Sequence, residues 1–137
     1  MKMKKGFTLI ELLVVISIIG LLIVFLAPKL VNVRDRAKEA GIKAVMHSVQ
    51  LSVEAYNGEN STYPIATSMA LYTLYDQYLK TGGYLTSLPK NPFTNADYTE
   101  KDTAGKIEYS YEASTDTYKL TGYKRDGKTK LLELSNL

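Results

Sequence analysis

The chain has 137 residues, of which 45% are hydrophobic, so it can hold one domain and a membrane segment and does not have a disordered composition. Its net charge of +3 comes from Lys2, Lys4 and Lys5, because the 17 basic side chains exceed the 14 acidic ones by these three. The sequence therefore predicts no basic patch and no direct nucleic-acid partner. The absence of cysteine excludes disulfides, thiol chemistry and cysteine-based zinc sites.

An apolar segment runs from Phe7 to Ala27 and is interrupted only by Thr8, Glu11, Ser17 and Gly20. As a helix it would be about 30 Å long, which matches the hydrocarbon core of a bilayer. The lysines in front of it and the long polar region behind it predict a single-pass protein of the inner or cytoplasmic membrane, with its N-terminus inside.

The segment does not end like an ordinary secretory signal, which carries a small-residue cleavage site after its apolar stretch. Pro28 and Lys29 follow instead, and the small residue Gly6 lies in front. Cleavage after Gly6 would remove the lysines and retain the helix. A charged side chain inside a bilayer costs about 2.5–3.5 kcal/mol, so Glu11 needs a partner. The new amine of Phe7 on a neighbouring subunit could provide one.

The stretch K-G-F-T-L-I-E-L at residues 5–12 resembles the class III signal of the type IV pilin superfamily. That superfamily includes type IV pilins, type II secretion pseudopilins and competence pilins. The resemblance implies that a prepilin peptidase cleaves between Gly6 and Phe7 and methylates the Phe7 amine. Glu11 would then be the acid at position five of the mature chain. Further implied partners are other copies of the chain, an assembly ATPase and membrane platform proteins.

Two residues weaken the predicted membrane helix. A glycine such as Gly20 costs about 1 kcal/mol relative to alanine, and an interior proline about 3 kcal/mol. Pro28 would also clash with the carbonyl of Val24, which predicts a kink near residues 24–28 unless Pro28 simply ends the anchor. The resemblance implies that the helix partly melts between Gly20 and Pro28 in a filament.

The helical pattern continues beyond the apolar segment. Small and apolar side chains recur there at spacings of three and four, namely Val33, Ala37, Ala40, Ala44, Ser48, Ser52 and Tyr56. Val45, Val49 and Val53 widen the same face, which is expected to pack closely against another part of the protein. These spacings predict one long helix from Phe7 to about Tyr56, with Asn57 and Gly58 as its end. A short second helix is predicted over residues 67–80.

Alternating side chains predict three strands, over residues 106–113, 117–123 and 130–134. We expect an α+β fold, in which the long helix packs against a small antiparallel sheet of about three strands with the last at an edge. The predicted parts are a leader at 1–6, a membrane or filament-core helix at 7–28, and a globular head at 29–137 that contains the helix 29–57. Eleven tyrosines are expected to pack with their hydroxyls at the surface.

The stretch L-P-K-N-P-F at residues 88–93 resembles a turn of major pseudopilins and several Gram-positive pilins. The same resemblance raises calcium as a possible cofactor, since major pseudopilins bind it through loop oxygens. The candidate ligands are Asp97, Asp102, Asp116 and Asp126. Their spacing is not that of an EF-hand, so solvated turn residues and no cofactor are favoured.

No nucleophile–base pattern, phosphate loop or HExxH motif indicates an enzyme. The favoured function is a structural subunit of a type IV pilus, serving adhesion, twitching motility or DNA uptake. Many copies would pack their N-terminal helices through a heterologous, non-closing contact into an extracellular or periplasmic filament. The alternative is a major pseudopilin of a type II secretion system. A third possibility is a membrane-anchored binding module that never polymerises.

Overall fold

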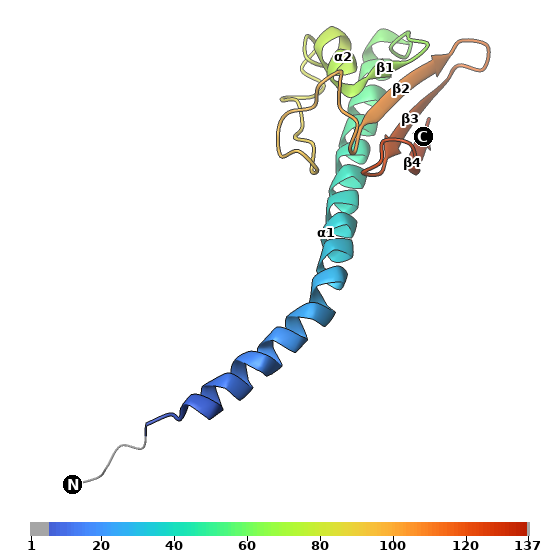
Figure 1. Cartoon of the computed structure of the whole chain (residues 1–137). Helices are drawn as coiled ribbons and strands as arrows, with labels where there is room; N and C mark the ends of the chain where they lie inside the picture. The colour runs from blue at the N-terminus through green and yellow to red at the C-terminus, as the bar shows by residue number, and fades with distance from the viewer. Residues whose placement is uncertain (1–5, 137) are drawn as a thin grey trace. The chain divides into compact units, whose positions relative to one another are not determined.

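The computed structural model describes residues 6–136 (Figure 1). The chain divides into two compact units, with the boundary between Arg36 and Ala37. The second unit, from Ala37 onward, contains most of the predicted head at 29–137, and from here on only this unit is called the head. Of the predicted leader, only Gly6 lies within the described residues.

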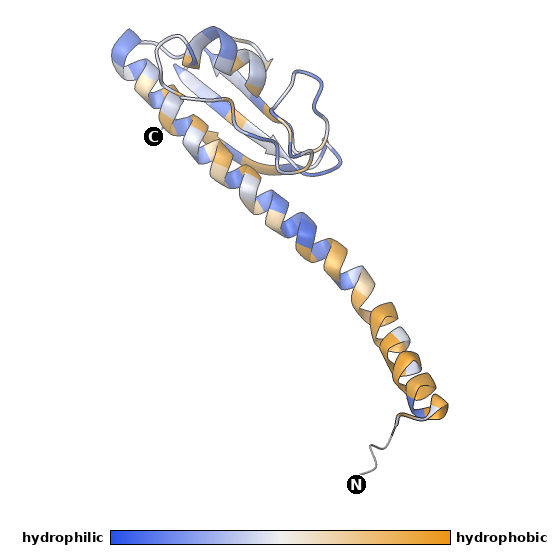
Figure 2. Ribbon diagram, turned by 90° about the vertical axis from the view of Figure 1, so that its left-hand side faces the viewer, coloured by the Kyte–Doolittle hydropathy of each residue, from blue (hydrophilic) through white to orange (hydrophobic). Residues whose placement is uncertain are grey.

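The first long element is α1, Leu9–Asn60, a helix of 52 residues. Its first part is almost uniformly apolar, as the orange stretch in Figure 2 shows. These apolar side chains are exposed, from 88% at Leu9 to 46% at Val15, and none of them is buried. Among residues 6–136, α1 is the one helix that is long and apolar enough to cross a membrane.

The bounds of α1 differ slightly from those predicted. The helix begins at Leu9 rather than Phe7, and it continues through Asn57 and Gly58 to Asn60. Its end is fixed by Ser61, which has a positive φ of 55° and donates its backbone N–H to the Asn57 carbonyl at 2.8 Å. Pro28 lies inside α1, so it does not end the anchor helix. The kink near Pro28 stays a prediction.

The head contains one antiparallel sheet whose strands follow chain order: β1 (Met69–Ala70), β2 (Ile107–Glu112), β3 (Thr117–Tyr123) and β4 (Lys130–Ser135). The three long strands and the edge position of the last confirm the predicted meander. The fold is α+β, with a long N-terminal helix and a four-stranded sheet. The register pairs Tyr109 with Leu120 and Gly122 with Leu132.

The predicted helix over residues 67–80 is wrong in its first part. Met69 and Ala70 form β1 and pair with Tyr109 and Glu108. Only α2, Leu71–Leu74, and the following π-helical turn η1, Tyr75–Leu79, are helical. Three leucines of these two elements are buried and hold them against the rest of the head: Leu71, Leu74 and Leu79.

The core of the head forms where the C-terminal part of α1 meets the sheet. Ile42, Met46, Val49 and Val53 are fully buried together with the inward side chains of β2 and β3. A Cβ on Gly122 would lie 2.4 Å from the sulfur of Met46, so this glycine allows the helix to approach β3 closely. The predicted packing face is only partly in the core. Val49, Ser52 and Val53 are buried, whereas the small residues at its other edge are exposed, namely Ala37, Ala40, Ala44 and Ser48.

The tyrosines pack as predicted, but the expected surface position of their hydroxyls is wrong for the most buried ones. Tyr109 donates its hydroxyl to the Pro64 carbonyl at 2.9 Å, and Tyr98 donates to the Gly105 carbonyl at 3.0 Å. Burial raises the pKa of both phenols, so both hydroxyls stay protonated and can donate. These bonds tie two loops to the core.

Candidate functional site

The residue that the sequence singles out, Glu11, lies in the first turn of α1. Its Oε2 accepts hydrogen bonds from the backbone N–H of Thr8 at 2.9 Å and from the Thr8 hydroxyl at 2.8 Å. In return, the Glu11 N–H donates to Thr8 Oγ1 at 3.3 Å. This reciprocal pair is a capping box, which satisfies free backbone donors at the start of a helix. The T-x-x-E spacing in the sequence indicates it, but the sequence analysis did not use that signal.

The capping box leaves the negative charge of Glu11 without a cationic partner among residues 6–136. The second carboxylate oxygen, Oε1, is also without a hydrogen bond there. Gly6 and Phe7 precede the helix as irregular backbone, and the Phe7 side chain is 87% exposed. The peptide bond predicted to be cleaved is therefore outside regular structure, directly before the first turn of α1.

The two helix-weakening residues are both inside α1. A Cβ on Gly20 would meet no atom within 4 Å, so no contact within the chain requires glycine there. Ser17 adds a third local feature, because its hydroxyl donates to the Leu13 carbonyl at 2.7 Å. A role of Gly20 and Pro28 in helix melting stays a prediction.

Of the four aspartates proposed as calcium ligands, Asp97 and Asp102 lie in the loop between η1 and β2, and Asp116 and Asp126 lie in the turns before and after β3. Asp97 forms an isolated antiparallel bridge with Lys90. Asp102 accepts from the Thr99 N–H at 3.1 Å and hydroxyl at 2.9 Å, while Asp116 accepts from the Tyr111 hydroxyl at 2.9 Å. No group of three or more acidic, histidine or cysteine side chains within residues 6–136 could hold a metal ion. The four aspartates therefore do not come together as one group of ligands within the described residues, and calcium binding, which needs six to eight oxygens, stays an untested expectation.

Asp126 closes the turn between β3 and β4. Its Oδ1 accepts from the backbone N–H groups of Lys128 and Thr129 at 3.0 and 2.8 Å, and its Oδ2 accepts from the Thr129 hydroxyl. Gly127 has a φ of +65°, and a Cβ there would lie 2.6 Å from the Thr103 carbonyl oxygen. The turn thus needs both the carboxylate and the glycine.

We expect the contribution of Asp126 to head stability to disappear in acid. The Thr129 hydroxyl and the two backbone donors lower the pKa of Asp126 to about 2, below its unfolded value near 3.8. The stabilisation is therefore present above about pH 4 and lost as the pH falls through 2. Thermal unfolding of the full chain should show Asp126→Ala melting a few degrees below wild type at pH 6, with the gap closing near pH 2. A constant gap across that range would contradict the assignment, and added calcium should leave both melting temperatures unchanged.

A buried asparagine that the sequence analysis did not single out organises the loop between η1 and β2. Asn91 is fully buried. Its Oδ1 accepts from the Phe93 N–H at 2.9 Å, and its Nδ2 donates to the Ala104 carbonyl at 2.9 Å and to Asp102 at 3.2 Å. The loop also contacts α1, since a Cβ on Gly41 would lie 3.0 Å from Pro92. The predicted turn at residues 88–93 is therefore a structural anchor of the head.

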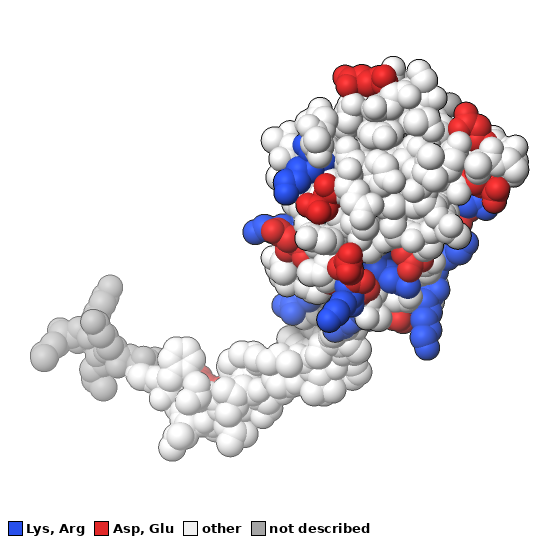
Figure 3. Space-filling view, turned by 90° about the horizontal axis from the view of Figure 1, so that it is seen from above, with Lys and Arg blue, Asp and Glu red and all other residues white. Residues whose placement is uncertain are grey.

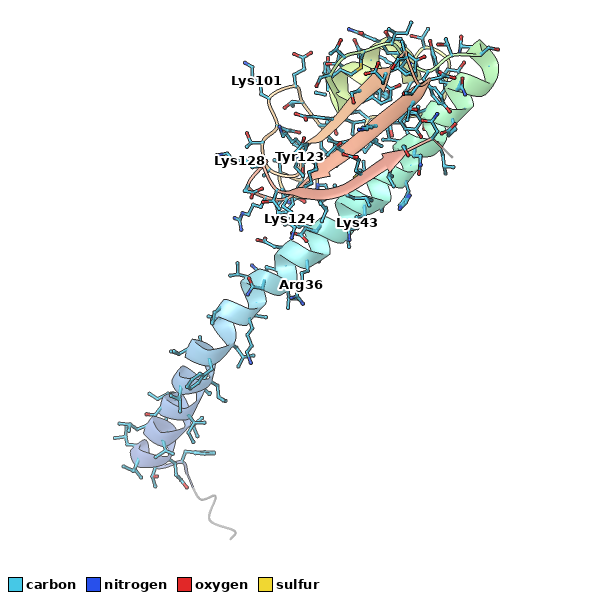
Figure 4. All side chains as sticks on the ribbon, turned by 90° about the vertical axis from the view of Figure 1, so that its right-hand side faces the viewer. Arg36, Lys43, Lys101, Tyr123, Lys124 and Lys128 are labelled. Carbon is cyan, nitrogen blue, oxygen red and sulfur yellow. The ribbon has the colours of Figure 1, made fainter. Side chains whose placement is uncertain are left out.

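Basic side chains of the head are interspersed with acidic ones, as the face in Figure 3 shows. Lys43, Lys124 and Lys128 lie toward one end of the head in Figure 4. Lys124 pairs there with Glu39 at 3.7 Å, and Lys128 flanks the Asp126 turn. This mixed surface adds no support for a nucleic-acid partner.

The sequence is similar to one family model and to several known proteins. Residues 1–27 match the family model described as the prokaryotic N-terminal methylation motif. The chain is 33% identical over 132 residues to the type IV narrow pilus major component PilA5 of Thermus thermophilus, covering 96% of both chains. It is 31% identical over 105 residues to the type II secretion system core protein G of Vibrio cholerae, covering 72% of this chain and 70% of that protein.

A second Thermus thermophilus protein, the type IV wide pilus major component PilA4, is 41% identical over 63 residues, which covers 46% of this chain and 48% of that protein. No solved structure gives a significant match. Of these three similarities, the one to PilA5 extends along almost the whole chain.

Proposed function

This chain belongs to the type IV pilin superfamily, and we propose that it is a major structural subunit of a type IV pilus. The observation that carries the proposal is the similarity to a pilus major component along 96% of both chains. A function in adhesion, twitching motility or DNA uptake would follow from such a filament. The proposed partners are other copies of the chain, a prepilin peptidase, an assembly ATPase and platform proteins.

The exposed apolar face of α1 supports polymerisation. The apolar side chains from Leu9 to Leu26 are exposed and join no core among residues 6–136, so they need either lipid or neighbouring helices around them. Lipid tails are as apolar as leucine, so burial alone does not favour the filament over the membrane. A specific polar pair between subunits can supply the difference. We propose that the Phe7 amine of one subunit pairs with Glu11 of the next.

Cleavage after Gly6 would make this pair possible. Before cleavage Phe7 carries no amine, and Glu11 has only the neutral donors of Thr8. After cleavage, the mature subunit is anchored in the membrane by α1, and its new N-terminus is positive. The subunit then leaves the membrane for an extracellular or periplasmic filament, where the two charges neutralise each other.

The second candidate function is a major pseudopilin of a type II secretion system. It is favoured by the 31% identity to a core protein G and by the L-P-K-N-P-F stretch, which Asn91 holds in place. The pilus assignment is preferred because the similarity to core protein G covers 72% of the chain, whereas the similarity to PilA5 covers 96%. The two differ in outcome: loss of a pilin removes surface filaments, whereas loss of a pseudopilin stops the export of secreted enzymes.

The first test is the mass of the chain in cells that contain the processing and assembly machinery. We expect the intact protein to lack residues 1–6 and to carry one added methyl group, which peptide mapping should place on Phe7. Sheared surface fractions should contain the same species in filaments. Gly6→Leu is the matched control, because a bulky residue at the cleavage position should leave the chain uncut and out of the filament fraction.

Two results would contradict the proposal. A wild-type chain that keeps Met1 in cells with active peptidase would remove the basis for the Phe7 amine. A processed chain found only as single membrane-anchored subunits would support the non-polymerising binding module instead.

A further inference from the structure

Three cations follow the apolar segment of α1 within the first unit. Lys29, Arg34 and Arg36 are exposed, and none has a hydrogen-bond or ion-pair partner among residues 6–136. Figure 4 shows Arg36 projecting from the helix. The neighbouring acid, Asp35, is half-buried and already engaged in an interaction within the chain. The cations are thus available to a ligand of opposite charge.

The apolar surface does not stop at Ala27. Leu30, Val31 and Val33 are exposed as well, and Lys29 is the one charge among them. As a helix, the stretch from Phe7 to Val33 is about 40 Å long, whereas the hydrocarbon core of a bilayer measures about 30 Å. The segment can therefore lie at two depths in the membrane.

In the shallower placement, residues 7–27 lie in the hydrocarbon. Glu11 is then inside the bilayer, and Leu30, Val31 and Val33 are left in water. In the deeper placement, residues 14–33 lie in the hydrocarbon. Glu11 is then at the membrane surface near the N-terminus, and Arg34 and Arg36 lie among the headgroups on the other side. Lys29 is close enough to that surface for its long side chain to reach the headgroups.

We propose that Lys29, Arg34 and Arg36 bind the headgroups of anionic phospholipids and thereby hold the unassembled subunit in the deeper placement. The membrane is the partner because the apolar segment continuous with these residues brings them to its surface. Each cation within a Debye length of an anionic surface strengthens binding about fivefold. This inference rests on the membrane anchoring of the proposed function but not on filament formation.

The deeper placement changes the state of Glu11 before assembly. Its carboxylate lies in the hydrated headgroup layer and keeps its charge without a partner subunit. It is then ready to meet the amine of a neighbouring Phe7 at the same surface. Entry into a filament would require the three cations to leave their lipids, so anionic lipid retains subunits in the membrane until assembly.

The absence of native cysteine makes the depth of the segment directly measurable. The full mature chain would carry a single reporter, Ile10→Cys or Val33→Cys, in nanodiscs of phosphatidylcholine with or without equimolar phosphatidylglycerol. Labelling by a membrane-impermeant maleimide reports exposure to water. With the anionic lipid, we expect severalfold faster labelling at position 10 and severalfold slower labelling at position 33.

Two variants, each of which removes three positive charges, test which residues respond to the lipid. The variant with Lys29→Gln, Arg34→Gln and Arg36→Gln should label at the same rates in both lipids. The control with Lys43→Gln, Lys101→Gln and Lys128→Gln, three exposed lysines of the head, should keep the lipid effect. Equal rates in both lipids for the wild-type segment would overturn the proposal, as would a lipid effect that survives the first variant or is lost in the control.

Filament formation is measured separately in cells, as the amount of the chain in filaments sheared from the cell surface. Wild-type filaments combined with lipid-independent labelling would refute the lipid site and leave the pilin function intact. A lipid effect in nanodiscs without filaments in cells would support the lipid site and refute the pilin function.

Discussion

Replacing Glu11 with alanine is expected to abolish filaments or reduce them strongly, while membrane insertion and cleavage after Gly6 persist. The apolar surface of α1 is unchanged by this substitution, so the anchor remains. What is lost is the acid that neutralises the Phe7 amine of the neighbouring subunit, a positive charge that would then be buried without a partner in the filament. The measurement is the amount of the chain in sheared filaments, by electron microscopy and immunoblot, together with its intact mass.

Because Glu11 also belongs to the capping box, two further variants separate its charge from its hydrogen bonds. Glu11→Gln keeps an acceptor for the Thr8 N–H, and glutamine is compatible with the box, but its charge is gone. Thr8→Ala removes the hydroxyl and keeps the charge. We expect Glu11→Gln to lose filaments and Thr8→Ala to retain them. The reverse pattern would assign the effect to helix capping.

Replacing Asn91 with alanine is expected to destabilise the head by about 3 kcal/mol, since two part-buried backbone groups lose their partners at about 1–3 kcal/mol each. These are the Phe93 N–H and the Ala104 carbonyl, which the Asn91 side chain satisfies at 2.9 Å each. The loop would also loosen at Lys38, which donates to the Phe93 carbonyl at 3.3 Å. Denaturant unfolding of the full chain in detergent, followed by the tyrosine signal in near-ultraviolet circular dichroism, measures the change.

Thr94→Ala is the matched control in the same loop, because Thr94 is exposed and its hydroxyl accepts one 3.3 Å bond from the Ala96 N–H. We expect it to stay within about 0.5 kcal/mol of wild type. If Asn91→Ala behaved like this control, the loop would be held by its contacts with α1 rather than by the asparagine.

The long elements of the fold could be predicted because their patterns repeat many times. The apolar run and the three- and four-residue spacing extend over most of α1, and each long strand has six or seven residues. β1 has two residues, too few for an alternation, and its pairing with β2 depends on residues almost forty positions away. The helical spacing of Met69, Tyr72, Tyr75 and Leu79 therefore decided the prediction for the whole segment.

The packing face of α1 shows a second limit of periodicity. Small residues and large apolar residues both recur at helical spacing, so the sequence does not say which set faces the sheet. Burial of Ile42 and Met46 removes more apolar surface from water than burial of alanines, and these two residues lie in the core.

The residues of the candidate site also differ in how far they could be predicted from the sequence. Gly6, Phe7 and Glu11 are close in sequence, so their proximity could be predicted, and the T-x-x-E spacing already contains the capping box. The aspartates are far apart in sequence, and whether they converge depends on loop paths that no local pattern specifies. The role of Asn91 depends on Ala104, a partner across the loop.

None of the apolar side chains of α1 from Leu9 to Leu26 is buried in a core of its own chain. A substitution such as Ile18→Ser therefore removes no core contact, and a purified subunit carrying it should melt like wild type. Stability measurements on isolated subunits therefore do not detect substitutions in this part of the sequence. Defects there become visible only when insertion into a membrane or incorporation beside other copies is the readout, so a normal melting curve is no proof of a competent subunit.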